Sequence, residues 1–140
     1  MEKIEMSDLI ERDGLYYERF SDIPYTGTVT GQRQGNIKDG MKHGLYVGYH
    51  DNGQLSYKIT YKDGMKHGPY VSYRENGRLW KKQTYKDGKQ HGPYVYYHNS
   101  GRLWDKGTYK NGKKDGPWVS FHDNGRLEYK GTYKDGKEIL

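Results

Sequence analysis

The sequence predicts an all-β protein, an elongated single-layer antiparallel β-meander of tandem 24-residue β-hairpins. The first observation behind this prediction is a 24-residue pattern that recurs without a gap, typified by KDGKQHGPYVYYHNSGRLWDKGTY. The second is the alternation of apolar and polar residues within each copy, and the third is the glycine that recurs at fixed places between the alternating runs. A short fixed period indicates a stack in which each unit packs on its neighbours. The copies begin at Lys38, Lys62, Lys86 and Lys110, and a truncated fifth begins at Lys134.

Residues 1–36 do not fit the 24-residue pattern. They combine a mixed polar and apolar stretch, which includes Leu9, Leu15 and Phe20, with a degenerate copy near residues 24–31. We therefore expect two regions: an N-terminal cap with a degenerate repeat over residues 1–36, and the repeat array over residues 37–140.

Each unit of the array is predicted to form a hairpin. The tenth position is always Val and the twelfth is Tyr or Phe, as in Val47 and Tyr49, so these side chains alternate along a first strand. A three-residue loop over residues 51–53, with its glycine left-handed, would pair Tyr49 with Leu55 and Val47 with Tyr57. The Val, Leu and ring residues would then form one apolar core face.

The same reasoning predicts a three-residue turn between units, for example over residues 62–64. The Gly68-Pro69 pair that follows is able to bend the strand and to change this count.

Composition limits the class of protein. Only 31% of the 140 residues are hydrophobic, and 16 are tyrosines, so a thick aliphatic core is excluded. The chain has no cysteine, which excludes disulfides and thiolate metal sites. No apolar run has the length of a membrane helix, and the opening MEKIEMSDLI lacks the features of a signal peptide. We expect a cytoplasmic protein, with a secreted protein trimmed at its N-terminus as the alternative.

Charge is distributed unevenly along the chain. There are 24 Lys and Arg against 18 Asp and Glu, a net charge of +6, yet residues 1–30 hold three basic residues against seven acidic ones. An acidic leader therefore precedes a basic array. The lysines either keep an open sheet soluble or attract an anionic partner to a basic surface.

The second face of the predicted sheet is the candidate binding surface. In the register above, an aromatic ring at the ninth position faces a lysine at the twenty-first position across each strand pair, which allows cation–π contact. Such residues either shield an open sheet or form the centre of a protein interface. The candidate partner-binding residues are Tyr70, Trp80, Lys82, Tyr94, Tyr96, Trp104, Lys106 and Trp118.

No catalytic, metal or cofactor site is predicted. The six histidines occupy two repeat positions, such as His43 and His50, and copies of one position lie about 9.6 Å apart, too far to share one zinc ion. We expect them to hydrogen-bond local backbone. The glycine-rich turns do not open helices, so they are not phosphate-binding loops. The chain is therefore predicted to be no enzyme.

The segments KDGKQHGPY and KGTYKDGK resemble MORN repeats, and GRLWDKGTYKNGKKDGPW resembles the bacterial variant found in antitoxins of toxin–antitoxin systems. The likeness covers about residues 14–140. It implies β-hairpin repeats, no catalysis, and binding to proteins or, in eukaryotic relatives, to membrane phospholipids. The sequence departs from the pattern at Ile59 and Gln83, which replace a glycine, and at Asp115, which replaces a histidine. We expect these departures to alter the surface.

The leading hypothesis is a non-enzymatic scaffold that binds a protein partner, such as a toxin, in the manner of an antitoxin or immunity protein. The alternative is a module that binds anionic phospholipid through its basic array. Single-stranded nucleic acid would need the same stacking rings and lysines, and the acidic leader disfavours it. The last strand, over residues 126–133, is predicted to be an exposed edge through which two copies could form a homodimer.

Overall fold

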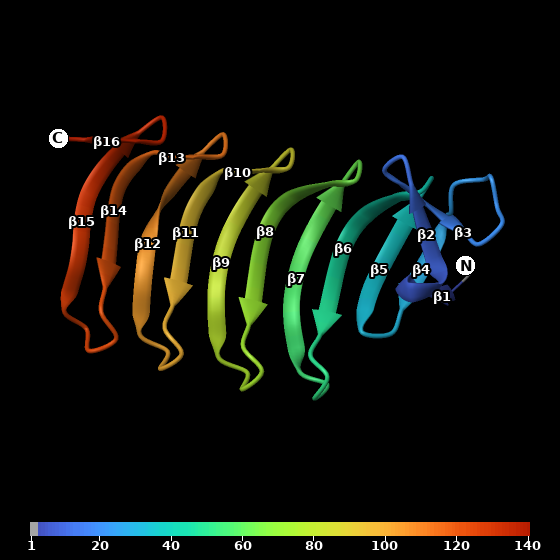
Figure 1. Ribbon diagram of the computed structural model, residues 1–140, viewed down its shortest axis with the longest axis horizontal. Coiled ribbons are helices and arrows are strands. Elements are labelled where there is room, and N and C mark those ends of the chain that lie inside the picture. Colours follow the sequence, from blue (N-terminus) through green and yellow to red (C-terminus); the bar gives the residue numbers. More distant parts are fainter. Residues whose placement is uncertain (1–2) are drawn as a thin grey trace.

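The computed structural model, which describes residues 3–140, is a long row of strands that follow one another across one sheet (Figure 1). This 14-stranded sheet runs in the order β1-β4-β5-β6-β7-β8-β9-β11-β12-β14-β15-β16, with the short β10 and β13 beside β9 and β12. All pairs are antiparallel except that of β1 with β4, which is parallel. The predicted all-β architecture of hairpin repeats is confirmed.

The N-terminal region holds β1 (Lys3–Glu5), the 3₁₀ turn η1 (Met6–Asp8), β2 (Leu9–Arg12), β3 (Leu15–Glu18), β4 (Gly27–Thr30) and β5 (Arg33–Lys38). The repeats hold β6 (Met41–Tyr49), β7 (Leu55–Lys62), β8 (Met65–Tyr73), β9 (Leu79–Lys86), β10 (Lys89–Gln90), β11 (Gly92–Tyr97), β12 (Leu103–Lys110), β13 (Lys113–Lys114), β14 (Gly116–Phe121), β15 (Leu127–Lys134) and β16 (Lys137–Ile139). Within residues 3–140, no helix has the length and apolar character needed to cross a membrane.

The tip of each hairpin has the predicted three-residue loop. In the first unit the His50 amide donates to the Gln54 carbonyl at 2.8 Å, and the Gly53 amide donates to the His50 carbonyl at 2.9 Å. Gly53 has a φ of 86°, in the left-handed region where a Cβ would be strained. Tyr49 pairs with Leu55, as the sequence predicts.

A β-bulge beside this tip changes the rest of the register. Val47 pairs with Lys58 and not with Tyr57, because Ser56 is an extra residue on the second strand. The predicted Val47–Tyr57 pair is therefore wrong. Since one extra residue reverses the alternation, valine shares a face with lysine in every unit, and the ninth-position ring shares the other face. The same shift recurs in the three following hairpins.

The turns between units have two residues, so the predicted three-residue turn is also wrong. Lys62 pairs with Met65 around Asp63 and Gly64, whose φ values are 51° and 78°. Two positive φ values define a type I′ turn, whose twist matches that of the strands it joins. The register between β7 and β8 instead shifts between Lys66 and Tyr70, where β8 has more residues than the facing part of β7. Gly68, at a φ of 99°, bends the strand there.

The two faces of the sheet therefore differ in content from the prediction. We call ring face the side that carries the ninth-position rings, and lysine face the side that carries the valines and the twenty-first-position lysines. The core lies on the ring face, where Tyr46 is 0%, Ile59 1% and Trp118 3% exposed. Val47 on the lysine face is only half-buried. The predicted core of Val, Leu and twelfth-position rings is wrong.

Each face carries one column of paired residues that runs across the repeats. The ring-face column is Tyr46, Ile59, Tyr70, Gln83, Tyr94, Gly107, Trp118 and Gly131, and the lysine-face column is Val47, Lys58, Val71, Lys82, Val95, Lys106, Val119 and Lys130.

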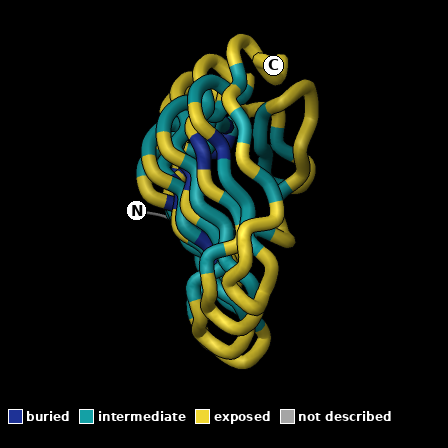
Figure 2. Tube along the Cα trace, turned by 90° about the vertical axis from the view of Figure 1, so that its left-hand side faces the viewer, coloured by how far each residue is buried: buried dark blue, intermediate teal, exposed yellow. Residues whose placement is uncertain are grey.

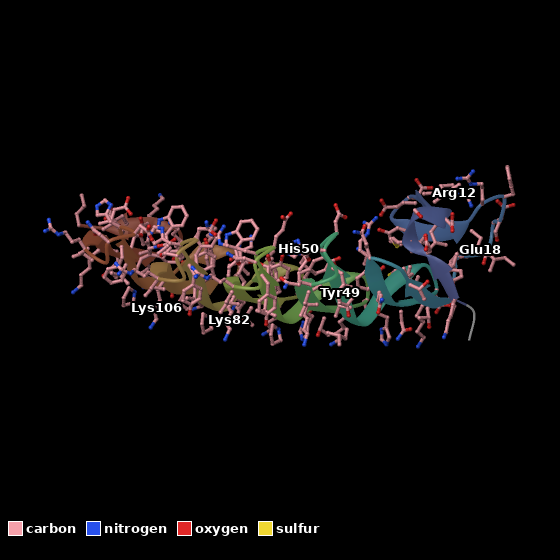
Figure 3. The ribbon with its side chains drawn as sticks, turned by 90° about the horizontal axis from the view of Figure 1, so that it is seen from below. Arg12, Glu18, Tyr49, His50, Lys82 and Lys106 are labelled. Atoms are coloured by element: carbon pink, nitrogen blue, oxygen red, sulfur yellow. The ribbon has the colours of Figure 1, made fainter. Side chains whose placement is uncertain are left out.

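The N-terminal segment packs against the start of the array. β4 pairs with β5, with Val29 opposite Gly35, and Val29 belongs to a buried cluster with Tyr25 and Ile37. Tyr16 of β3 packs against this cluster. β2 and β3 form a separate hairpin that lies on the opposite side of the sheet from the labelled Lys82 and Lys106 (Figure 3). The boundary at residue 36 stays a prediction.

At the other end, β15 is partly covered. β16 pairs with residues 132–134 of β15, and leaves the remainder of its outer side without a strand among residues 3–140. The predicted exposed edge is therefore shorter than residues 126–133. Exposed residues gather at the hairpin tips, whereas the strands are mostly half-buried and only a few residues are fully buried (Figure 2).

Candidate functional site

A continuous row of aromatic rings lies on the ring face of the middle units. The ring centroids of Trp80 and Tyr96 are 6.2 Å apart, and those of Tyr96 and Trp104 are 4.9 Å apart. The ring of Tyr94 stacks on Trp118 at 5.5 Å and lies 6.5 Å from Tyr96, so the rings form one connected surface. We call aromatic strip the set Tyr70, Trp80, Tyr94, Tyr96, Trp104 and Trp118.

The β-bulges put the tryptophans into this row. Tyr96 pairs with Asp105 and Tyr97 with Leu103, so Trp104 is the extra residue of its bulge, and Trp80 occupies the same place one unit earlier. A bulge re-aims the side chain of its extra residue, here towards Tyr96. The first and fourth units have Ser56 and Glu128 at this position. The exposed part of the strip is therefore confined to the two middle units.

Two predicted site residues do not belong to this surface. Lys82 pairs with Val71 and Lys106 with Val119, so both amines lie on the lysine face and point away from the strip (Figure 3). The predicted contact between ninth-position rings and twenty-first-position lysines is wrong, for the reason that the bulge reverses the alternation. The six aromatic residues of the prediction do share one face.

Other cations contact the rings, and the sequence analysis missed them. The Arg74 guanidinium lies 5.0 Å and the Lys81 amine 5.4 Å from the Trp80 ring centroid. Lys114 lies 4.5 Å from the Trp118 ring and 5.0 Å from that of Tyr133. These contacts fall in the range of cation–π attraction. The lysine that recurs at the fifth position of most units, such as Lys114, was the signal in the sequence for part of these contacts. The face of the sheet on which this lysine lies depends on the two-residue turn before it.

The Asp105 carboxylate fixes the Trp118 ring of the aromatic strip. The Trp118 indole Nε1–H donates to Asp105 Oδ1 at 2.7 Å, and the Ser120 hydroxyl donates to the same oxygen at 2.8 Å. Asp105 lies on the strand next to both donors, since it pairs with Ser120. It therefore orients a buried ring.

Side-chain sizes alternate along the ring-face column. Trp118 lies beside Gly107 on one side and pairs with Gly131 on the other, so the largest ring has glycine on both flanks. Ile59 and Gln83 replace glycine where the neighbouring ring is the smaller tyrosine. Both are buried, so the expectation that these departures alter the surface is wrong.

Four histidines contact backbone groups of the following unit and not local backbone: His50, His67, His91 and His98. Nε2 of His50 lies 2.9 Å from the Tyr73 carbonyl, and His67 Nδ1 accepts from the Asp87 amide at 3.3 Å. Among residues 3–140, no group of three or more His, Asp or Glu side chains could hold a metal ion.

Burial of the rings perturbs their ionisation. Desolvation raises the pKa of Tyr46 to about 12, and desolvation together with the Asp105 charge raises the pKa of Tyr94 to about 12. Burial also raises the pKa of Tyr61, Tyr85 and Tyr109. It lowers the pKa of the Lys42 amine, which lies over the Tyr46 ring.

We predict that the fold loses stability between pH 10 and 12. The tyrosine pKa values are higher in the folded state, so their contribution is fully present below pH 10 and is lost as the pH rises towards 12. The loss is at most about 1.4 kcal/mol per pH unit for each tyrosine, and is smaller where solvent screens the ring. Lys42 acts in the opposite direction but is a single group. Urea unfolding from pH 8 to 12 measures this slope. Tyr94→Phe should reduce the slope of unfolding free energy against pH by the contribution of one tyrosine. An equal slope in this variant would contradict the raised pKa of Tyr94.

Comparison with known protein families finds the same repeats in the sequence. The family model of the MORN repeat variant matches four times, over residues 42–63, 66–87, 90–111 and 114–135. No curated protein matches the chain. Among solved structures, one chain from the crystal structure of the GtfA/B complex bound to UDP and GlcNAc is similar, with 14% identity over 62% of this chain and a TM-score of 0.35. The match spans only 22% of that other chain. Because the four family matches cover more than half of its residues, this chain belongs to the MORN repeat variant family.

Proposed function

We propose that this chain is a protein-interaction module of the antitoxin or immunity type, and that it covers a surface of its partner with the aromatic strip. MORN repeats are in general interaction modules and are not typically catalytic. The observation that carries the proposal is the accessible ring row of the middle units, in which Trp104 is 37% exposed and stacks on His98 at 4.6 Å. Clustered tryptophan and tyrosine side chains are the usual centre of a protein interface. The antitoxin type is inferred from the resemblance of the repeats to that bacterial group.

The N-terminal segment of the chain supports this use of the ring face. At the first unit, the Tyr46 hydroxyl donates to the Met6 sulfur at 3.3 Å, and Lys42 lies 5.9 Å from the Tyr16 ring centroid. A polypeptide segment of this chain therefore already covers the ring face where the array begins. A partner would continue the same packing over the rings of the following units.

The test is binding to the product of a neighbouring gene, co-expressed and co-purified with this chain. We expect Trp80→Ala with Trp104→Ala to weaken the complex at least tenfold, about 1.4 kcal/mol or more, because truncated tryptophans at an interface centre commonly cost this much. Lys82→Ala with Lys106→Ala, on the opposite face, is the matched control and should bind normally. Titration calorimetry gives both affinities.

Full-strength binding by the tryptophan variant would refute the role of the strip. Circular dichroism must first show that this variant keeps the strand signal of the parent chain, because Trp80 is half-buried.

A second candidate is anionic phospholipid, supported by the lysine face. Lys58, Lys82, Lys106 and Lys130 are exposed, and none has a carboxylate within 4.0 Å among residues 3–140. Flotation with vesicles that contain acidic lipid tests this candidate at low salt. Here the Lys82→Ala, Lys106→Ala variant should lose binding and the tryptophan variant should keep it. The same two variants thus separate the two candidate functions.

A further inference from the structure

A row of alternating fifth-position side chains and tyrosines crosses the ring face near the turns between units. The fifth-position residue pairs across the strands with the tyrosine that ends the preceding unit, as Lys66 does with Tyr61 and Lys114 with Tyr109. Residues that pair directly across two strands lie on the same face of the sheet. The fifth-position residues are Lys42, Lys66, Gln90 and Lys114.

In three units the lysine at this position lies over two rings of its own unit. The Lys66 amine is 5.6 Å from the Tyr70 ring centroid and 5.1 Å from that of Tyr85. Lys42 and Lys114 lie between 4.5 and 5.1 Å from the corresponding two rings of their units. We call ring pair the ninth-position ring and the final tyrosine of one unit. Each of these three ring pairs holds one ammonium group by cation–π attraction.

The third unit has a ring pair without a cation. Tyr94 and Tyr109 lie edge to face with centroids 5.6 Å apart, much as Tyr46 and Tyr61 do at 5.8 Å. Gln90 occupies the fifth position, and within the described part of the chain no lysine or arginine has its charged group over either tyrosine of this pair. The Gln90 Oε1 is buried and has no hydrogen-bond partner there. This ring pair therefore lacks both a cation and a donor for the amide oxygen.

A negative charge lies beside the same ring pair. Asp105 is the twentieth residue of the third unit, where the other units have tyrosine or lysine. Burial, and after it the Asp105 charge, raises the pKa of both Tyr94 and Tyr109. The side chains of Gln90, Tyr94 and Tyr109 are all partly exposed, so a side chain of another molecule can reach them. The third unit thus favours a cation from outside the chain.

We propose that the ring pair of the third unit binds the ammonium group of a lysine side chain from the partner protein. The inference rests on the proposed function, because the aromatic strip would bring the partner to Tyr94, which belongs to both surfaces. Lysine is the fitting cation, since the other three ring pairs hold a lysine amine in this way. The ammonium would lie over both rings, and the terminal amide of Gln90 would turn its Oε1 towards it as an acceptor.

The first probe is n-butylammonium chloride, which has the structure of the end of a lysine side chain. NMR spectra of the chain with labelled tyrosines follow the ring signals, which single tyrosine-to-phenylalanine variants assign. We expect saturable shifts at Tyr94 and Tyr109 with a dissociation constant on the order of 10–100 mM. Neutral n-butanol, and sodium chloride at the same ionic strength, should not produce them. The Tyr70 and Tyr85 rings, which already hold Lys66, are the internal control and should shift little.

Gln90→Lys supplies the missing cation from the chain itself. It should abolish the butylammonium shifts at Tyr94 and Tyr109, because its own amine would occupy the ring pair. It should also raise the midpoint of thermal unfolding by about 2 °C, since it adds one cation–π contact. Thr108→Lys adds the same charge at an exposed position of the lysine face, and as the matched control it should leave the shifts unchanged.

The complex with the partner tests the source of the ammonium group. Gln90→Lys should weaken this complex about tenfold in titration calorimetry, because it fills the ring pair and repels the partner's lysine. Absence of saturable shifts at Tyr94 and Tyr109, or unchanged partner affinity in Gln90→Lys, would overturn the proposal. The variant Trp80→Ala, Trp104→Ala keeps every residue of the ring pair. Its full-strength binding would therefore refute the role of the strip without removing the butylammonium shifts, so the two failures are distinguishable.

Discussion

Gly107→Ala is expected to lower the free energy of unfolding by about 3 kcal/mol, near the upper end of the usual cost of overpacking. A Cβ at this position would overlap atoms Cε3 and Cδ2 of the Trp118 ring, closer than real Cβ contacts ever come. The ring cannot move aside easily, because it is 3% exposed and its Nε1–H is bonded to Asp105. The backbone of Gly107 does not have a positive φ, so the penalty is purely one of volume. Urea unfolding followed by circular dichroism measures it.

The smaller ring of tyrosine should relieve this clash. Tyr46 and Tyr70 flank Ile59 without difficulty, so in a Trp118→Tyr background the cost of Gly107→Ala should fall below about 1 kcal/mol. Thr108→Ala, an exposed neighbour, controls for changes in strand propensity. An equal cost in both backgrounds would show that Trp118 is not the obstacle.

Asp105→Ala is expected to destabilise the fold by a similar amount, about 3 kcal/mol. It removes the one acceptor shared by Trp118 Nε1–H and the Ser120 hydroxyl, and hydrogen bonds to charged groups contribute about 1.5–3 kcal/mol each. The indole N–H of a ring that is 3% exposed would lose its acceptor. Thermal unfolding should show a midpoint about 10 °C lower.

Asparagine separates the acceptor from the charge. Asp105→Asn keeps an oxygen for one of the two donors and should recover about half of the lost stability. It should also lower the pKa of Tyr94, because the Asp105 charge is the second cause, after burial, of its rise to about 12. Spectrophotometric titration of the tyrosines follows this change. A Tyr94 pKa that stays at its parent value in Asp105→Asn would contradict the proximity of the two groups.

Much of the fold was predictable from local signals. The 24-residue period indicates the row of hairpins, and the left-handed requirement at Gly53 indicates the three-residue tip, because both depend only on neighbours in sequence. The pairing of Tyr49 with Leu55 follows from that tip. The sharing of one face by the six aromatic candidates was also predictable, but their role in binding stays a prediction.

The faces of the sheet were not predictable beyond the tip. The extra residue at Ser56 and the two-residue turn at Asp63 each shift the alternation by one, and neither has a distinct signature in the pattern. Lys82 was therefore placed beside the rings when it lies on the opposite face, and the valines were placed in the core when they are half-buried. A single residue of shift exchanges every side chain between faces.

The sequence by itself thus determined that this protein is an open row of β-hairpin units that belongs to the MORN repeat variant family, because repetition and turn chemistry act over a few residues. Only the tertiary structure decided which side chains meet: the rings with Arg74 and Lys81, Trp118 with Asp105, and the N-terminal segment with the first unit. These contacts depend on the summed register of bulges and turns, and on packing between residues distant in sequence, where close fit of side-chain volumes chooses among registers that local preferences leave equal.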